Sequence, residues 1–148
     1  MKTYDPKKVD VVLAGQRLNS GLADGTWLAY TGAAPGFSKK VGVDGEVTRA
    51  RSHTRSGEVR LTLMASSANN DVLSRLYRDD RDGNANGRGV GSLLIQDRNG
   101  TTLLQASQAW ISDDPDISMG AEVETREWVI EVADVDVFHG GLNDTSTA

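Results

Sequence analysis

The sequence predicts a mainly β domain: an antiparallel β-sandwich or barrel-like fold with one short α-helix and one long β-hairpin arm. Three observations lead to this prediction. Short runs alternate between apolar and polar residues, turn-forming residues separate these runs, and only one segment has apolar residues at helical spacing. At 148 residues the chain suits a single domain, which we place at residues 1–141, with a flexible tail at 142–148.

The first strands follow from alternation. Val9, Val11 and Leu13 are spaced two apart, which indicates a strand. A turn-rich stretch follows at residues 15–25, and residues 27–31 are expected to form a second strand that ends before Pro35 and Gly36. Residues 59–65 alternate regularly, as is typical of a strand with one buried face.

Residues 37–60 carry the most informative pattern in the chain. Asp44 and Gly45 predict a hairpin with a type I′ turn, which needs positive φ at both central positions. Basic side chains dominate its strands: Lys39, Lys40, Arg49, Arg51, Arg55 and Arg60 stand against Asp44, Glu46 and Glu58. The few apolar residues between them are Val41, Val43 and Val47. Because this hairpin has little to bury in its own domain, we expect an arm that contacts another subunit.

The predicted helix follows residues 67–70, which offer several N-cap side chains. Its apolar face comprises Val72, Leu73, Leu76 and Tyr77, and residues 79–89 are expected to end it. A second hairpin is centred on Asn99-Gly100, with strands at residues 92–98 and 101–111. Residues 113–116 are expected to form an exposed turn.

The last predicted strand changes face part-way. Trp128, Ile130 and Val132 share one parity, whereas Val135 and Val137 have the other. A bulge or bend near residues 133–134 would reconcile the two sets. Glu127 and Glu131 oppose the first apolar set, so one face of this strand is expected to be polar.

Charge is segregated along the chain, which has a net charge of −5. Residues 113–136 hold nine acidic side chains and one basic one, Arg126, whereas the arm is basic. In an assembly of identical chains, such regions supply complementary faces. The alternative is that both are simply solvated, because exposed ion pairs contribute little to stability.

Several function classes are disfavoured by composition. The chain has no cysteine, which excludes disulfides and thiolate chemistry. It has no apolar run of membrane-spanning length, so we expect no membrane insertion. The acidic balance argues against a dedicated duplex-DNA binder, although not against a protein past which DNA slides. We expect no cofactor, no metal and no enzymatic activity.

Two acidic segments offer weak metal alternatives. Residues 82–87 read Asp-Gly-Asn-Ala-Asn-Gly, like the start of a calcium loop, but the twelfth position is Leu93 rather than the bidentate Glu. Residues 113–116 contain three aspartates, which we interpret as an exposed turn. His53 and His139 lack the spacing of a metal-binding pair.

Short sequence pieces occur in a characteristic order between residues 4 and 141. They are Tyr4-Asp-Pro-Lys-Lys-Val9, Leu22-Ala-Asp-Gly-Thr-Trp27, Val41-Gly-Val-Asp-Gly-Glu-Val47, Arg55-Ser-Gly-Glu-Val59, Asn70-Asp-Val-Leu73, Asp97-Arg-Asn-Gly-Thr-Thr102, Ala109-Trp-Ile111, Arg126-Glu-Trp128 and Phe138-His-Gly-Gly141. In this order and spacing, the chain resembles the inner tail-tube proteins of contractile-tailed phages.

The resemblance implies a virion structural subunit with a tail-tube fold and no catalytic residues. Such subunits form hexameric rings that stack into a hollow tube, through which DNA passes during ejection. The implied partners are further copies of the chain and the tail sheath, baseplate and tail-terminator proteins, with assembly in the cytoplasm of a bacterial host. A carboxylate-lined lumen would repel phosphate, and Glu127 and Glu131 are the candidates for that lining.

Alternative functions stay open at this point. A tube protein of a related contractile injection system, such as a bacteriocin or secretion apparatus, shares the implied fold. From another class, a small carbohydrate- or protein-binding β-sandwich is the main rival, and a calcium-dependent hydrolase is the most distant. Trp27, Trp110 and Trp128 lie in strand-like segments beside apolar neighbours, so we expect core or interface anchors rather than ligand-stacking platforms.

Overall fold

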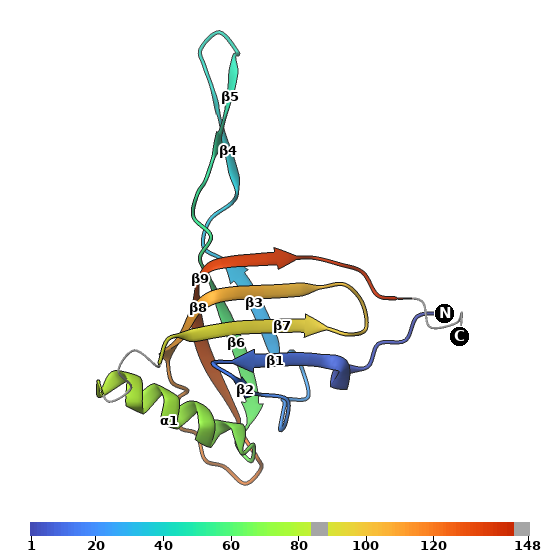
Figure 1. Ribbon diagram of the computed structural model, residues 1–148, viewed down its shortest axis with the longest axis vertical. Coiled ribbons are helices and arrows are strands. Elements are labelled where there is room, and N and C mark those ends of the chain that lie inside the picture. Colours follow the sequence, from blue (N-terminus) through green and yellow to red (C-terminus); the bar gives the residue numbers. More distant parts are fainter. Residues whose placement is uncertain (84–88, 144–148) are drawn as a thin grey trace.

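The computed structural model describes residues 1–83 and 89–143. Its strands form one seven-stranded sheet, in the order β2-β1-β7-β8-β9-β6-β3, and a separate two-stranded sheet, β4-β5 (Figure 1). The strands are β1 (Val9–Leu13), β2 (Gln16–Arg17), β3 (Leu28–Gly32), β4 (Phe37–Val41), β5 (Val47–Arg51), β6 (Gly57–Met64), β7 (Gly91–Asp97), β8 (Leu103–Asp113) and β9 (Thr125–Phe138). A 3-10 turn, η1 (Pro6–Lys8), precedes β1, and the helix α1 (Asn69–Arg81) follows β6. The mainly β, antiparallel class with one helix and a long hairpin is confirmed.

The large sheet folds back on itself because its two longest strands change face part-way. In β9, every second residue from Trp128 to Val132 is buried, but the next buried residue, Val135, lies three positions further on. The change coincides with Asp134, whose φ is 53°. In β8 the buried parity changes at residues 107–108, where the register with β7 also shifts. The bend expected near residues 133–134 is therefore confirmed, and it makes two layers from one sheet (Figure 1).

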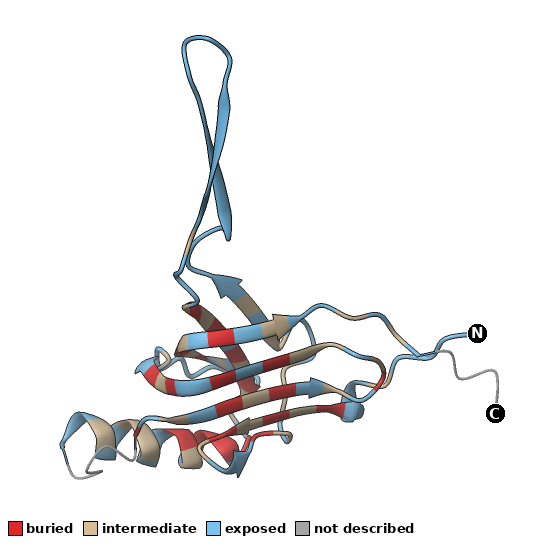
Figure 2. Cartoon of the chain, turned by 45° about the horizontal axis from the view of Figure 1, so that its top comes forward, coloured by how far each residue is buried: buried red, intermediate tan, exposed pale blue. Residues whose placement is uncertain are grey.

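The core lies between these layers and is closed along one side by α1. Its most completely buried side chains are Leu13, Leu18, Leu61, Leu63, Leu73, Leu93, Ile130, Val11, Val59 and Val132 (Figure 2). Trp128 is only 2% exposed, and its Nε1 donates a hydrogen bond of 3.0 Å to Asn70 Oδ1 on α1. Trp27 is half-buried against the core. Trp110 is half-buried on the other face of the sheet, opposite Glu131.

Two details of the secondary structure differ from the sequence prediction. β2 lies within the stretch expected to be only turns, where Gln16 and Arg17 pair with the end of β1. The helix continues through Arg81, into the segment expected to end it. Its N-cap position, Ala68, has no side-chain cap; instead the Ser67 hydroxyl accepts a hydrogen bond from the Asn69 N–H at 3.2 Å.

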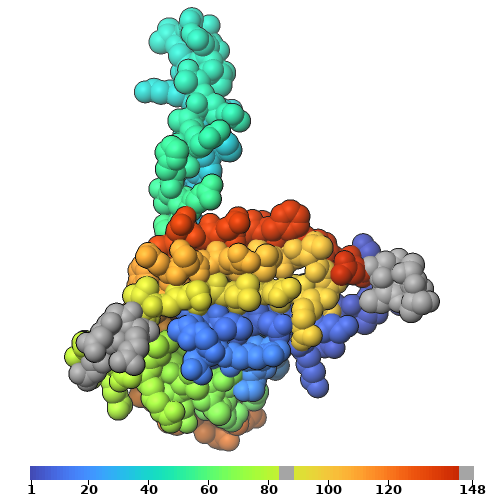
Figure 3. Space-filling model, viewed as in Figure 1, coloured from blue at the N-terminus to red at the C-terminus, as the bar shows by residue number. Residues whose placement is uncertain are grey.

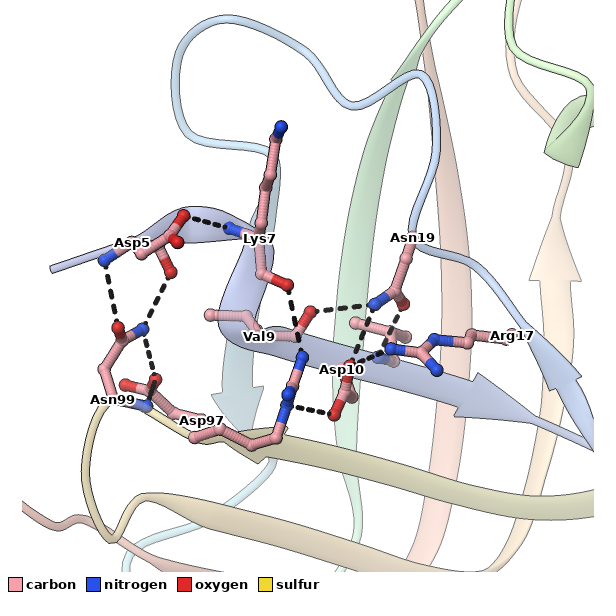
Figure 4. A network of polar contacts seen from close by, with 10 residues as sticks. Asp5, Lys7, Val9, Asp10, Arg17, Asn19, Asp97 and Asn99 are labelled. Carbon is pink, nitrogen blue, oxygen red and sulfur yellow. Dashed lines mark hydrogen bonds and ion pairs between the residues drawn. The ribbon is translucent and has the colours of Figure 1, made fainter.

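The turn between β7 and β8 is fastened to the N-terminal segment (Figure 4). The side chain of Asn99, only 6% exposed, accepts a hydrogen bond from Asp5 N–H and donates one to Asp5 C=O, both at 2.9 Å. Asp97 N–H bonds to Thr102 C=O at 3.1 Å, and Gln96 pairs with Leu103, so the hairpin is centred on Asn99-Gly100, as predicted. Gly100 packs so closely against the backbone of Gly141 that a Cβ has no room there.

A second polar cluster surrounds Asp10 on β1 (Figure 4). Arg17 and Arg98 pair with its two carboxylate oxygens at 2.6 and 2.8 Å, and Asn19 donates a hydrogen bond at 3.0 Å. Burial raises the pKa of the Asp10 carboxyl, but the Asn19 hydrogen bond and the charges of Arg17 and Arg98 outweigh it, so the pKa is lowered overall. This network secures β1 to the turn that follows β7.

The C-terminal segment stays attached beyond β9. Leu142 bridges to Gly100, and the Asn143 N–H donates to Asn99 C=O at 2.8 Å. Both Leu142 and Asn143 lie in the segment expected to be a tail, 142–148, and residues 144–148 lie outside the described part.

Candidate assembly interface

The strands β4 and β5 form the arm (residues 37–51), which projects from the body of the protein (Figures 1 and 3). Every residue of both strands is exposed (Figure 2). Its hairpin turn is closed by bonds from Gly45 N–H to Gly42 C=O at 3.0 Å and from Gly42 N–H to Glu46 C=O at 2.7 Å. The predicted arm is thus present as an isolated two-stranded ribbon.

The predicted type I′ turn is wrong. Gly45 has a φ of 89°, but Asp44 is not among the described residues with positive φ. The structure is a three-residue loop, Val43 to Gly45, with glycine at the left-handed position. The Asp44 carboxylate instead accepts a hydrogen bond from Glu46 N–H at 3.1 Å, which supports the turn from within.

Cross-strand pairing in the arm is poor in stabilising contacts. Lys39 lies directly opposite Arg49, and like charges at such positions are destabilising. Val41 faces Val47 near the tip, and Lys40 faces Thr48 on the other side of the ribbon. The Arg49 guanidinium lies 4.4 Å from the centre of the Phe37 ring, and Arg51 lies 5.8 Å from it.

The arm also leaves apolar surface and backbone edges uncovered. Phe37 is 49% exposed, Val41 56% and Val47 59%, and Val43 at the tip is fully exposed. A single two-stranded hairpin is marginally stable at best in water. An arm of this kind is therefore suited to a contact with another molecule, through its side chains or its free strand edges.

The base of the arm is fixed to the bend of β9. The Val135 N–H donates a hydrogen bond to Arg55 C=O at 2.7 Å, immediately after the left-handed Asp134. Ser52 N–H bonds to Gly36 C=O at 2.8 Å across the root of the hairpin. Arg55 therefore belongs to the anchored base rather than to the ribbon, and these bonds set the direction in which the arm leaves the domain.

Glu127 and Glu131 lie on the face of β9 that points away from the core, as the parity predicted. Glu127 forms an ion pair with Arg60, and Arg60 also pairs with Glu58 at 2.6 Å. Glu131 lies opposite Glu58 in the register of β6 and β9. Arg60, which the sequence pattern grouped with the arm, is instead part of this face, and its alternation with buried Val59 and Leu61 was the signal for that position.

An acidic loop (residues 113–124) connects β8 to β9. It carries five carboxylates and no basic residue. All its residues are exposed except the half-buried Pro115, and Ile117 and Met119 are each 79% exposed. The expected turn at residues 113–116 is thus only the start of a longer loop, whose end is held by a bond from Ala65 N–H to Glu124 C=O at 2.8 Å.

An open groove of about 800 Å³ lies beside the edge strand β3. Trp27, Leu22 and Ile95 contribute to its lining, as does the N-terminal segment around Pro6. Among the described residues, no group of three or more His, Cys, Asp or Glu side chains is placed to hold a metal ion. The calcium-like segment of residues 82–87 falls largely outside the described part of the chain.

A projecting arm, an exposed acidic loop and an edge strand, β3, are features of a subunit that assembles with others. Over residues 8–140 the chain matches the family described as the Bacteriophage PhiTE tail tube protein. The protein belongs to this tail-tube family. It is a structural component of a phage virion and a subunit of the tail tube.

Similar proteins agree with this assignment. The tail-tube protein is 27% identical to "Structural protein ORF10" of Pseudomonas phage KPP10, over 99% of this chain and 87% of that one. Its fold is similar to a chain of a gene transfer agent virion, with a TM-score of 0.61, 12% identity and coverage of 93% and 100%. It is also similar to a sheath/tube terminator of an extracellular contractile injection system, with a TM-score of 0.61, 10% identity and coverage of 94% and 99%.

No helix in the described part of the tail-tube protein is long and apolar enough to cross a membrane.

Proposed function

We propose that this subunit forms hexameric rings that stack into a hollow tube, and that phage DNA passes through the tube during ejection. The observation that carries the proposal is the fully exposed arm, whose two strands pair with each other and with no other strand of the described residues. The tail-tube family supports a tube as the assembly, and the ring number follows the resemblance to inner tail-tube proteins.

Two head-to-tail contacts are sufficient to build such a tube. A contact whose rotation closes gives a ring, and a contact that does not close gives growth along an axis. The edge strand β3 and the groove beside it suit the lateral contact, because an unpaired edge invites pairing. The arm suits the axial contact, since it reaches beyond the body of its own subunit (Figure 3).

The tube would work together with other tail proteins. Solved structures of similar fold are described as a sheath-tube complex and as a sheath/tube terminator. By analogy we assign the tail sheath, the tail terminator and the baseplate as partners of this subunit. We assign no enzymatic activity and no cofactor to it, because its family is a structural one.

The polar face of β6 and β9 is our candidate for the lumen. It holds the carboxylates of Glu58, Glu127 and Glu131 against the single guanidinium of Arg60, a net charge of −2 on these four groups. A negative wall repels phosphate, which lets DNA move without sticking. Glu131 is the better candidate of the original two, because Arg60 already neutralises much of the charge of Glu127.

Light scattering of the purified protein in the presence of EDTA tests the assembly. We expect particles far larger than a monomer even with EDTA, because the proposed contacts between subunits need no metal ion. A stable monomer at high concentration, in both low and moderate salt, would contradict the proposal and favour a small ligand-binding module.

Replacing Glu131 by Lys tests the lumen: tubes should still form, and DNA ejection should slow. Ejection kinetics equal to the parent, in particles shown to contain the variant, would remove Glu131 from the lumen.

A further inference from the structure

Two surfaces of opposite charge lie at opposite ends of the molecule. The arm extends from one end of the longest axis, and the acidic loop closes the other end (Figures 1 and 3). The ribbon of the arm carries Lys39, Lys40, Arg49 and Arg51 against Asp44 and Glu46. The acidic loop carries Asp113, Asp114, Asp116, Glu122 and Glu124 and no basic side chain.

Both surfaces also expose apolar side chains beside their charges. The arm exposes Phe37, Val41, Val43 and Val47, and the acidic loop exposes Ile117, Met119 and Val123. Single exposed apolar residues are ordinary on protein surfaces. A group of them on one short segment, at each of two ends, marks surfaces that become covered in an assembly.

Between described residues, no ion pair forms with the charged groups of either surface. The ion pairs among the described residues gather on Asp10 and on Arg60, in the body of the protein. None involves the basic residues of the arm or the carboxylates of the acidic loop. Complementary potentials of this kind steer encounter and fix register between partners.

We propose that the arm of one subunit docks on the acidic loop of a second copy stacked along the long axis. Lys39, Arg49 and Arg51 share one face of the ribbon with Val41 and Val47. On this face the basic side chains meet the carboxylates of the loop, and the valines near the tip pack against Ile117 and Met119. This assignment rests on the proposed tube and names the surface on which its axial contact forms. Because donor and acceptor surfaces lie at opposite ends, the contact is head-to-tail and repeats from copy to copy.

Disulfide trapping tests the docking directly, since the chain has no cysteine of its own. Val43→Cys is combined in one chain with Ile117→Cys or with Met119→Cys, and assembled tubes are oxidised and run on a denaturing, non-reducing gel. We expect a ladder of covalent oligomers from at least one pair, because a disulfide needs Cα atoms within about 7 Å. The matched control pairs Val43→Cys with Asp79→Cys on the exposed surface of α1 and should give no ladder. Tubes without a ladder from either loop position, or an equal ladder from the control, would overturn the docking.

Charge exchange gives a second test that separates this docking from the tube itself. Lys39→Glu with Arg49→Glu, a cross-strand pair on one face, should shorten the tubes, and so should Asp114→Lys with Asp116→Lys. Combining all four changes should restore long tubes, whereas Asp79→Lys alone should leave them unaffected. If the parent makes no tubes, the proposed function fails. If the parent makes tubes but the combined variant assembles no better than either pair, the tube stands and the arm docks elsewhere.

Discussion

The two long hairpins of this tail-tube protein have the same topology and opposite surroundings. The hairpin β7–β8 lies in the middle of the large sheet, with β1 on one side and β9 on the other. It buries Leu93, Ile95, Leu104 and Ala106, and Asn99 fastens its turn to the N-terminal segment. The hairpin β4–β5 has no neighbouring strand in the described part of the protein, and none of its own strand residues is buried.

The difference shows where each hairpin obtains its stability. Burial of alternate side chains stabilises β7–β8 within the monomer, because each fully buried aliphatic side chain contributes about 1.5–3 kcal/mol. The arm has no comparable contribution and sets Lys39 against Arg49. Changes in the body should therefore act on folding, whereas changes in the arm should act on assembly. The following predictions test that separation, in order of decreasing effect on the free energy of unfolding.

The largest effect is expected at Trp128. Trp128→Ala should lower the free energy of unfolding by about 3–5 kcal/mol, because it removes a buried aromatic side chain and leaves Asn70 Oδ1 without the N–H that it accepts from. Phe37→Ala in the arm is the matched control and should change this free energy by less than about 0.5 kcal/mol. Urea denaturation followed by circular dichroism measures both. Equal losses in the two variants would contradict the separation.

A smaller effect is expected at the turn of the buried hairpin. Asn99→Ala leaves the Asp5 N–H and C=O without their partners, which should cost about 1–3 kcal/mol. Asp44→Ala removes the side-chain bond that supports the turn of the arm and should cost less than about 0.5 kcal/mol, since that bond is exposed. Melting temperatures of the two variants, compared with the parent, check the order.

The sequence predicted the buried part of the fold well, because alternation reports burial directly. The parity change between Val132 and Val135 was sufficient to place the bend of β9. The sequence did not predict β2, because a strand of two residues is too short to show an alternating pattern. The helix runs further than expected, because Asp79 and Asp80 do not themselves break a helix. The turn of the arm was assigned the wrong type, since an Asp-Gly pair also fits a loop in which glycine alone is left-handed.

The candidate surfaces were harder to predict, because they depend on which segments meet in space. The basic arm was recognisable from its charge and its few apolar residues. The ion pair between Arg60 and Glu127 joins residues 67 apart in the chain, and no local pattern indicates it. The separation of the acidic residues into an exposed loop and a sheet face likewise depends on where β8 and β9 end and begin.

A pH-dependent effect is expected from Asp10. Its lowered pKa in the folded protein means that its contribution to stability is present above the ordinary value near 3.8 and is lost as pH falls through the folded value. Asp10→Asn should therefore lower the free energy of unfolding at pH 6 by about 1 kcal/mol or less, since Arg17 and Arg98 are largely exposed. The difference in free energy of unfolding between this variant and the parent should shrink as the pH falls below the folded pKa of Asp10. A difference independent of pH would contradict this role of the Asp10 charge.

The smallest effect on folding, with the largest effect on assembly, is expected from shortening the arm. Replacing residues 41–47 by a short Gly-Ser link should change the free energy of unfolding by less than about 0.5 kcal/mol, because none of these side chains is buried. The folded subunit should no longer form long tubes in electron micrographs. Normal tubes from the shortened protein would show that the arm has no role in assembly.

Amide hydrogen exchange of the dispersed subunit and of the assembled tube tests the central claim most directly. Local stability varies across a structure, and exchange reports it residue by residue. The amides of β7 and β8 should be protected in both states. The amides of residues 37–51 should exchange rapidly in the dispersed subunit and become protected in the tube. An arm that is already protected in the dispersed subunit, or that stays unprotected in the tube, would contradict the account.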